Sequence, residues 1–138
     1  MIKRLFLLPF AALVFSASVH AETVSIEPGL WDYEYSVLLG GLPLGETGKE
    51  CVAADEATVS LQSAAKELNE NCSISSISSI ENGYAFTLTC TGDMPGEASG
   101  KVISTGDGLN VSVSGTAGPG DTPLPFRLDG RATRAGTC

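Results

Sequence analysis

Hydrophobic and polar residues alternate with a period of two along much of this 138-residue chain. The clearest case is the segment 31–37, in which Trp31, Tyr33 and Tyr35 alternate with acidic and hydroxyl-bearing residues. This spacing is typical of a β-strand with one apolar face and one solvated face. Further short strands are predicted at 49–52, 72–80, 84–90, 98–105, 109–114 and 126–132.

Glycine, proline and asparagine mark the turns between these strands. Asn82-Gly83 predicts a β-hairpin between two of the strands, and Gly106-Asp107-Gly108 predicts another. The segments 38–48 and 115–125 are rich in glycine and proline and are predicted to be loops.

One helix is predicted from Asp55 to about Leu68, because small and apolar residues recur there at helical spacing. Short strands joined by tight turns and interrupted by one helix indicate a mainly β (α+β) fold. We expect a single-domain antiparallel β-meander of about six or seven strands, with the helix covering one face. The sheet is expected to be curled or to form a partial barrel.

The first 21 residues have the layout of a secretory signal peptide. Two basic residues precede an apolar run from Leu5 to Phe15, and the segment ends in Ala21, after which we expect cleavage. The run is shorter than the ~20 residues of a membrane-spanning helix, so no membrane anchor is expected after processing. The predicted boundaries are therefore 1–21 for the signal peptide and 22–138 for one exported domain, periplasmic or secreted.

Charge and histidine content exclude several functions. The chain has 16 acidic and 8 basic residues, and cleavage would change its net charge from −8 to −10 because Lys3 and Arg4 are lost. Such a surface repels nucleic-acid phosphates and anionic lipids, so neither is an expected partner. The single histidine, His20, would leave with the signal peptide. Nucleophiles activated by histidine and histidine-based metal sites are therefore excluded from the mature domain.

Four cysteines remain in the mature chain, at Cys51, Cys72, Cys90 and Cys138. In an exported domain of this size we expect two disulfides, and four cysteines permit three pairings. A three-residue loop at 81–83 would place Cys72 and Cys90 on one face near the open end of the first hairpin, whereas a two-residue turn would place them on opposite faces. We favour Cys72 with Cys90, which leaves Cys51 to pair with Cys138.

A set of short motifs extends over the whole mature chain. They are Pro28-Gly29-Leu30-Trp31 before an acidic and aromatic strand, Cys51 before the helix, Cys72, the strand end Thr87-Leu88-Thr89-Cys90, and the final Gly136-Thr137-Cys138. With the signal peptide, this combination resembles domain-of-unknown-function family 3617, which consists of small exported bacterial proteins. Family members often carry two adjacent basic residues shortly before the closing G-x-C, where this chain has Arg131-Ala132-Thr133-Arg134-Ala135. The resemblance implies export and the cysteine framework, and it implies no catalytic residue.

The aromatic stripe of Trp31, Tyr33 and Tyr35 is a candidate ligand-binding site, because these side chains combine apolar area with a polar tip. The alternative is that this face of the strand belongs to the core. On the other face, Asp32 and Glu34 lie at a separation that overlaps that of paired glycosidase carboxylates. Adjacent acids on a wet strand are usually solvated, so a carboxylate-only hydrolase is the least favoured function, and we expect neither a metal nor a cofactor.

Two loops, 38–44 and 117–125, are rather apolar for exposed connections. In a meander they could project from one end of the sheet and form a portal or a docking edge. Burial against the domain's own core is the alternative. We expect a binding module and not an enzyme, with an apolar small molecule or an envelope protein as its partner. A structural or stress-related envelope protein without a ligand pocket is the alternative function.

Overall fold

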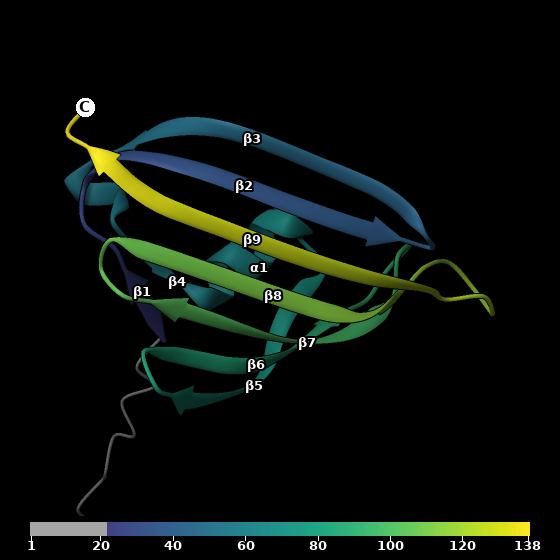
Figure 1. The fold of residues 1–138 in the computed structure, drawn as a ribbon. Helices are drawn as coiled ribbons and strands as arrows, with labels where there is room; N and C mark the ends of the chain where they lie inside the picture. Colours follow the sequence, from purple (N-terminus) through teal and green to yellow (C-terminus); the bar gives the residue numbers. More distant parts are fainter. Residues whose placement is uncertain (1–21) are drawn as a thin grey trace, which may run out of the picture.

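A curled antiparallel sheet of seven strands forms most of the protein in a computed structural model that describes residues 22–138 (Figure 1). The predicted signal peptide lies outside the described residues. The strands are β2 (Gly29–Leu39), β3 (Leu42–Val52), β5 (Cys72–Ile80), β6 (Gly83–Cys90), β7 (Gly96–Ser104), β8 (Gly108–Ala117) and β9 (Leu124–Gly136). This architecture confirms the predicted mainly β fold.

The strand order is β3-β2-β9-β8-β7-β6-β5. Strands β5 to β9 form the expected meander, and the β2–β3 hairpin joins it through β9, the last strand of the chain. Over the described residues the sheet does not close into a barrel, and β3 and β5 are its two edges.

A small layer covers part of the concave face of this sheet. It consists of α1 (Leu61–Leu68) and a two-stranded sheet of β1 (Thr23–Ser25) and β4 (Thr58–Ser60), preceded by the 3-10 turn η1 (Ala54–Glu56). Within residues 22–138, no helix is long and apolar enough to cross a membrane.

The helix prediction over 55–68 is correct only for its second half. Thr58 and Val59 are β-branched and extended, because they pair with β1. The helix begins after Ser60, whose Oγ accepts a hydrogen bond from the backbone N–H of Ser63 at 3.0 Å. This N-cap satisfies a backbone donor that the first helical turn leaves unpaired.

The loop prediction over 38–48 is wrong, because most of this segment belongs to β2 and β3. Only Gly40-Gly41 form the turn, and both have positive φ, 56° and 88°, as a two-residue hairpin turn requires. Gly48 has a different role in the strand itself. A Cβ at Gly48 would lie 2.5 Å from the hydroxyl oxygen of Tyr33, so this glycine leaves room for the tyrosine ring on the neighbouring strand.

Both favoured disulfides are present, Cys51–Cys138 and Cys72–Cys90, and no cysteine of the described chain is free. The first links β3 to the residues that follow β9. The second joins directly opposed residues of β5 and β6.

A β-bulge at Ser75, and not the predicted three-residue loop, aligns Cys72 with Cys90. The hairpin turn has two residues, Glu81 and Asn82, with Asn82 at φ 60°. That turn alone would place the two sulfur atoms on opposite faces. The extra residue at Ser75 shifts the register by one and returns both cysteines to the same face.

The apolar core lies between α1 and the concave face of the sheet. Its buried cluster consists of Ala65, Cys72, Leu88, Ala98 and Val113. In the described part of the chain, no large side chain is completely buried. The core is therefore built from small and medium side chains that do not fill the space between the two layers.

Gly29 allows β2 and β9 to approach closely. It has φ +145°, and a Cβ there would lie 2.4 Å from the carbonyl oxygen of Gly136. We expect Gly29→Ala to lower the free energy of unfolding by about 3 kcal/mol, through backbone strain and displacement of β9. Gly41→Ala is the matched control, because Gly41 has φ +88° with no neighbouring atom within 4 Å. The control should cost only about 1 kcal/mol in urea unfolding, and equal losses would contradict a role for the close approach.

Candidate functional site

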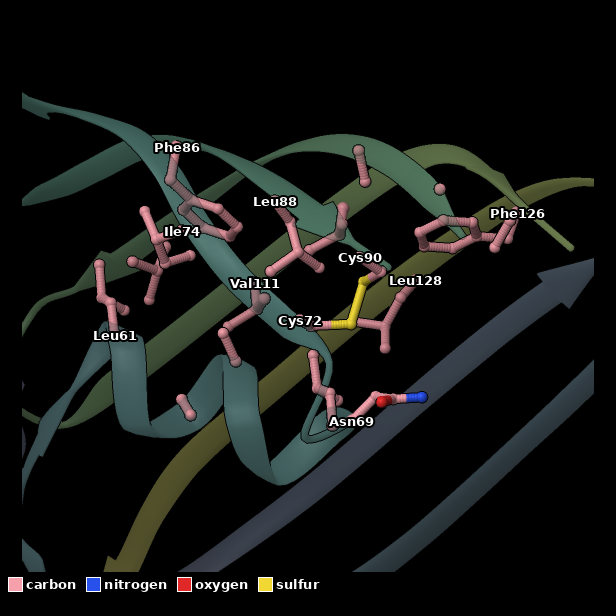
Figure 2. A pocket seen from close by; sticks show the side chains of 18 of the residues that line it. Leu61, Asn69, Cys72, Ile74, Phe86, Leu88, Cys90, Val111, Phe126 and Leu128 are labelled. Atoms are coloured by element: carbon pink, nitrogen blue, oxygen red, sulfur yellow. A yellow bond between two sulfur atoms is a disulfide. The ribbon is translucent and has the colours of Figure 1, made fainter. Parts of the chain in front are cut away.

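A cavity of about 530 Å³ lies between α1, the small β1–β4 sheet and the concave face of strands β5 to β9 (Figure 2). Phe86, Leu88 and Val111 reach into it from the sheet, and Leu61 reaches into it from the helix. The wall consists mainly of aliphatic and aromatic side chains, and the Cys72–Cys90 disulfide forms part of it.

The cavity exists because the helix is too small to fill the concave face. The eight residues of α1 give a length of about 12 Å. Seven strands at a spacing of ~4.8 Å span roughly 29 Å. On the side of α1 that faces the sheet, Ala64 and Ala65 lie between Leu61 and Leu68. Ala65 is buried against the sheet and Ala64 is only partly buried, and a methyl group extends less far than a leucine or phenylalanine side chain, so space remains between the layers.

Few polar side chains contribute to the described wall. The polar residues among those that line it are Asn69, Glu97 and Thr116. Glu97 and Thr116 are opposed on β7 and β8, and by strand alternation their side chains face the convex side, as those of Lys101 and Ser112 do. The Oδ1 of Asn69 accepts a hydrogen bond from the backbone N–H of Asn71 at 2.9 Å. No buried side-chain nitrogen or oxygen in the described residues lacks a hydrogen-bond partner. Apolar cavities of this kind offer water few partners, and they accept apolar molecules. The arrangement suits hydrophobic binding.

The cavity opens at the end of the sheet where α1, β6 and β8 end. Five of its lining residues are solvent-exposed, and four of these lie at that end: Leu68, Met94, Glu97 and Thr116. Leu68 is 66% exposed and Met94 is 40% exposed. A ligand could therefore enter here without any movement of the sheet.

The two apolar loops noted in the sequence meet at this opening. The Gly40 N–H donates to the Pro125 carbonyl oxygen at 2.9 Å, and the Gly118 N–H donates to the Pro95 carbonyl oxygen at 3.1 Å. These bonds connect the β2–β3 turn, the β8–β9 loop and the β6–β7 loop. Several large exposed apolar side chains lie on α1, on the β6–β7 loop and near the hairpin and loop ends of β2, β3 and β9, and we call them the apolar rim: Leu38, Leu42, Leu44, Leu68, Met94 and Leu124. Leu68 and Met94 also line the cavity.

The aromatic stripe does not form part of the cavity wall. Trp31, Tyr33 and Tyr35 share a face with Leu128, but they lie on β2, beyond β9 and away from α1. Trp31 is only 3% exposed, and its Nε1 donates to the carbonyl oxygen of Glu27 at 2.9 Å. The alternative interpretation, that this residue packs in the core, therefore holds for Trp31.

The two tyrosines lie on the more open part of the same face. Tyr33 covers Gly48, and Tyr35 is 40% exposed. The hydroxyl of Tyr35 donates to a carboxylate oxygen of Glu46 at 2.9 Å, and this hydrogen bond raises the pKa of Tyr35 above its ordinary value. Contact of these tyrosines with a ligand stays a prediction.

Asp32 and Glu34 lie on the convex face, opposite the cavity side. Asp32 is 3.3 Å from the ammonium group of Lys49, and Glu34 pairs with Arg131. Both carboxylates are about half exposed, as expected for solvated surface ion pairs. Across residues 22–138, no group of three or more histidine, cysteine, aspartate or glutamate side chains is placed to hold a metal ion.

The family model described as "Protein of unknown function (DUF3617)" matches residues 26–138. The chain belongs to this family. Membership in DUF3617 covers nearly the whole described domain and confirms the resemblance seen in the sequence motifs. Neither the curated proteins nor the solved structures contain a match to this chain. DUF3617 assigns no activity, so function has to be argued from the cavity.

Most of the cavity wall was not identified from the sequence. One usable signal was the pair Ala64-Ala65 in the centre of the apolar stripe of the helix. Small residues at the middle of a packing face leave volume unfilled unless large residues face them. The sheet residues that face Ala64 and Ala65 could be identified only from the register of the strands.

Proposed function

We propose that this protein is an exported binding module that holds an apolar small molecule, a single hydrocarbon chain, in the cavity beneath α1. The observation that carries the proposal is the apolar cavity of about 530 Å³. Ligand sites commonly enclose roughly 300 to 1,000 Å³ and are lined mainly by apolar side chains. A binding role without catalysis is supported by the polar groups, which lie at the opening or in surface ion pairs.

We place this function in the periplasm or outside the cell. The signal-peptide layout of residues 1–21 supports export. The two disulfides support it as well, because such bonds persist in oxidising compartments. A net charge of −8, or −10 after cleavage, argues against nucleic acid as the partner.

Straight-chain alcohols should displace a neutral fluorescent probe, N-phenylnaphthylamine, from the cavity with affinities that rise with chain length. A buried methylene contributes about 0.8 kcal/mol, so each added methylene should tighten binding about fourfold. The rise should stop once the chain fills the cavity. Fluorescence displacement with the purified, oxidised protein measures these affinities.

Diols of the same length are the matched control. A second hydroxyl at the buried end would lose its hydrogen bonds to water without gaining a partner, so diols should bind much more weakly. An affinity that does not depend on chain length, or probe fluorescence that no alcohol displaces, would contradict the proposed function.

The apolar rim supports a second candidate function, docking of an envelope protein. Exposed apolar side chains gathered at one end of a small domain are a common mark of an interaction surface. Under this second function, the protein is a structural or stress-related envelope protein, and the cavity is a region of incomplete packing that holds no ligand. Failure of every alcohol to bind, together with one dominant neighbour in cross-linking of intact cells, would favour this function.

A further inference from the structure

We infer that the cavity sets the length of its ligand, an unbranched hydrocarbon chain of roughly 12 to 16 carbon atoms that enters with its methyl end first. The methyl end comes to rest against a wall formed by β1 and Leu109. This inference rests on the proposed binding function. It adds which end of the chain enters first, how long the chain can be and which residues limit its length.

The cavity extends along the strands that form its floor, and its two ends differ. At one end, Leu68 and Met94 line the cavity and are 66% and 40% exposed. At the other end, beside the β7–β8 turn, Val102 and Leu109 line it. Val102 is only 5% exposed, and Leu109 shares the cavity face of β8 with Val111 by strand alternation. The ends are a strand's length apart, because β7 connects the loop that contains Met94 to this turn.

The segment that contains β1 lies across the cavity at the β7–β8 turn (Figure 1). The Ser104 hydroxyl donates to the Ser25 carbonyl oxygen at 3.1 Å, and the Glu27 N–H donates to the Gly106 carbonyl oxygen at 3.1 Å. These bonds fix the segment to the end of β7 and to the turn. Aliphatic side chains line the cavity here, and those that we call the end wall are Val24, Ile26, Leu61, Val102 and Leu109.

The side chains on the floor increase in size from the opening toward the end wall. On β7 the residues that line the cavity begin with Gly96 and Ala98 and end with Val102. On β8 they change from Ala117 near the opening to Leu109 at the end wall. A chain can therefore lie along the floor from the opening, and the larger side chains stop it at the end wall.

The end wall determines which end of the ligand leads. A polar leading group would lose its hydrogen bonds to water there, and aliphatic side chains offer none in exchange. A methyl group has no such cost, and burying it is favourable. The methyl end therefore leads, and the polar end stays toward Leu68 and Met94.

The length of the floor gives the length of the chain. Val102 lies six residues after Gly96 on β7, so the floor is about 20 Å long. Carbon–carbon bonds of about 1.5 Å in a zigzag advance about 1.3 Å each, so an extended chain of roughly 12 to 16 carbon atoms spans this floor. In displacement of N-phenylnaphthylamine by straight-chain alcohols, the rise in affinity should stop in this range.

Leu109→Ala should move this limit to longer chains. The substitution removes three carbon atoms from the end wall, so affinity should continue to rise for about two or three more methylenes than in the unchanged protein. Leu68→Ala is the matched control, because it removes the same atoms from a lining residue at the open end, where the chain is not confined. The control should leave the limit unchanged.

Val24→Phe should move the limit in the opposite direction, by about two methylenes, because the ring would extend from β1 into the cavity. This variant keeps the inference testable if Leu109→Ala does not fold. A limit that stays fixed in the folded variants, that moves equally in Leu68→Ala, or that lies well outside 12 to 16 carbon atoms in the unchanged protein would overturn the inference. The proposed function would stand in these cases, provided that affinity still rises with chain length. Affinity that is independent of chain length in the unchanged protein would overturn the proposed function itself.

Discussion

Val111→Phe combined with Ala64→Leu should raise the free energy of unfolding while abolishing the binding of hydrocarbon chains. Val111 extends into the cavity from β8 and Ala64 lines it from α1, so the two larger side chains would fill the space from both walls. Filling a cavity commonly adds about 0.5 to 2 kcal/mol of stability. The same atoms would occupy the space of the ligand, so affinity for decanol should fall by more than about tenfold. Urea unfolding and probe displacement measure the two effects on one sample.

Ser112→Phe is the matched control for this variant. Ser112 is the next residue on β8, is exposed, and by strand alternation faces the convex side. A phenylalanine there should change stability by at most about 0.5 kcal/mol and leave decanol binding intact. A loss of about 1 to 3 kcal/mol in the double variant would instead show that the layers already pack tightly. Binding that survives the double variant would place the ligand elsewhere.

The double variant is expected to gain stability and to lose binding. This combination distinguishes a ligand site from a core that is merely incompletely packed, in which filling the space would change stability alone. An empty apolar cavity lowers the free energy of unfolding of a small domain, because the atoms that line the cavity lose dispersion contacts. Here Leu68 and Met94 of the apolar rim also line the cavity, and Ala64 on α1 is a position from which a larger side chain could extend into it. A cavity retained at the expense of stability is what a binding module requires.

Sequence reasoning recovered features that depend on local chemistry. The strand of Trp31, Tyr33 and Tyr35 and the hairpin at Asn82-Gly83 follow from alternation and turn residues. Both disulfides were also predicted correctly, but through a three-residue loop that the structure replaces with a two-residue turn and a bulge at Ser75. The position of the two apolar segments at one end of the sheet was one of two alternatives that the sequence left open, and most of the first segment is strand and not loop.

The features that sequence reasoning missed depend on contacts between distant segments. The extended conformation of Thr58 and Val59 is stabilised by β1, more than thirty residues earlier in the chain. Gly48 resembles a loop residue until Tyr33 is seen to lie over it. The bulge at Ser75 has no distinctive residue in a run of serines and isoleucines. The cavity depends on the number of strands that face one short helix, and the local pattern does not contain that number.

Removal of the Cys72–Cys90 disulfide should impair both stability and ligand binding, whereas removal of Cys51–Cys138 should impair stability alone. The two bonds connect residues 18 and 87 positions apart. In the chain-entropy treatment, closing these loops stabilises the fold by about 3 and about 4.5 kcal/mol. Cys51→Ala, Cys138→Ala should therefore cause the larger loss of stability in urea unfolding. Small domains are stable by only about 5 to 15 kcal/mol, so either loss is easily measured.

The two disulfides differ in their position relative to the cavity. Cys72 and Cys90 line it and hold β5 against β6 beside Leu88, whereas Cys51 and Cys138 are exposed. In Cys72→Ala, Cys90→Ala, the strand ends at the opening can separate, and we expect affinity for decanol to fall by about fivefold or more. The Cys51→Ala, Cys138→Ala variant, although less stable, should bind decanol with unchanged affinity in the absence of denaturant. An equal loss of affinity in both variants would show that binding depends on global stability, and that the Cys72–Cys90 bond does not shape the opening.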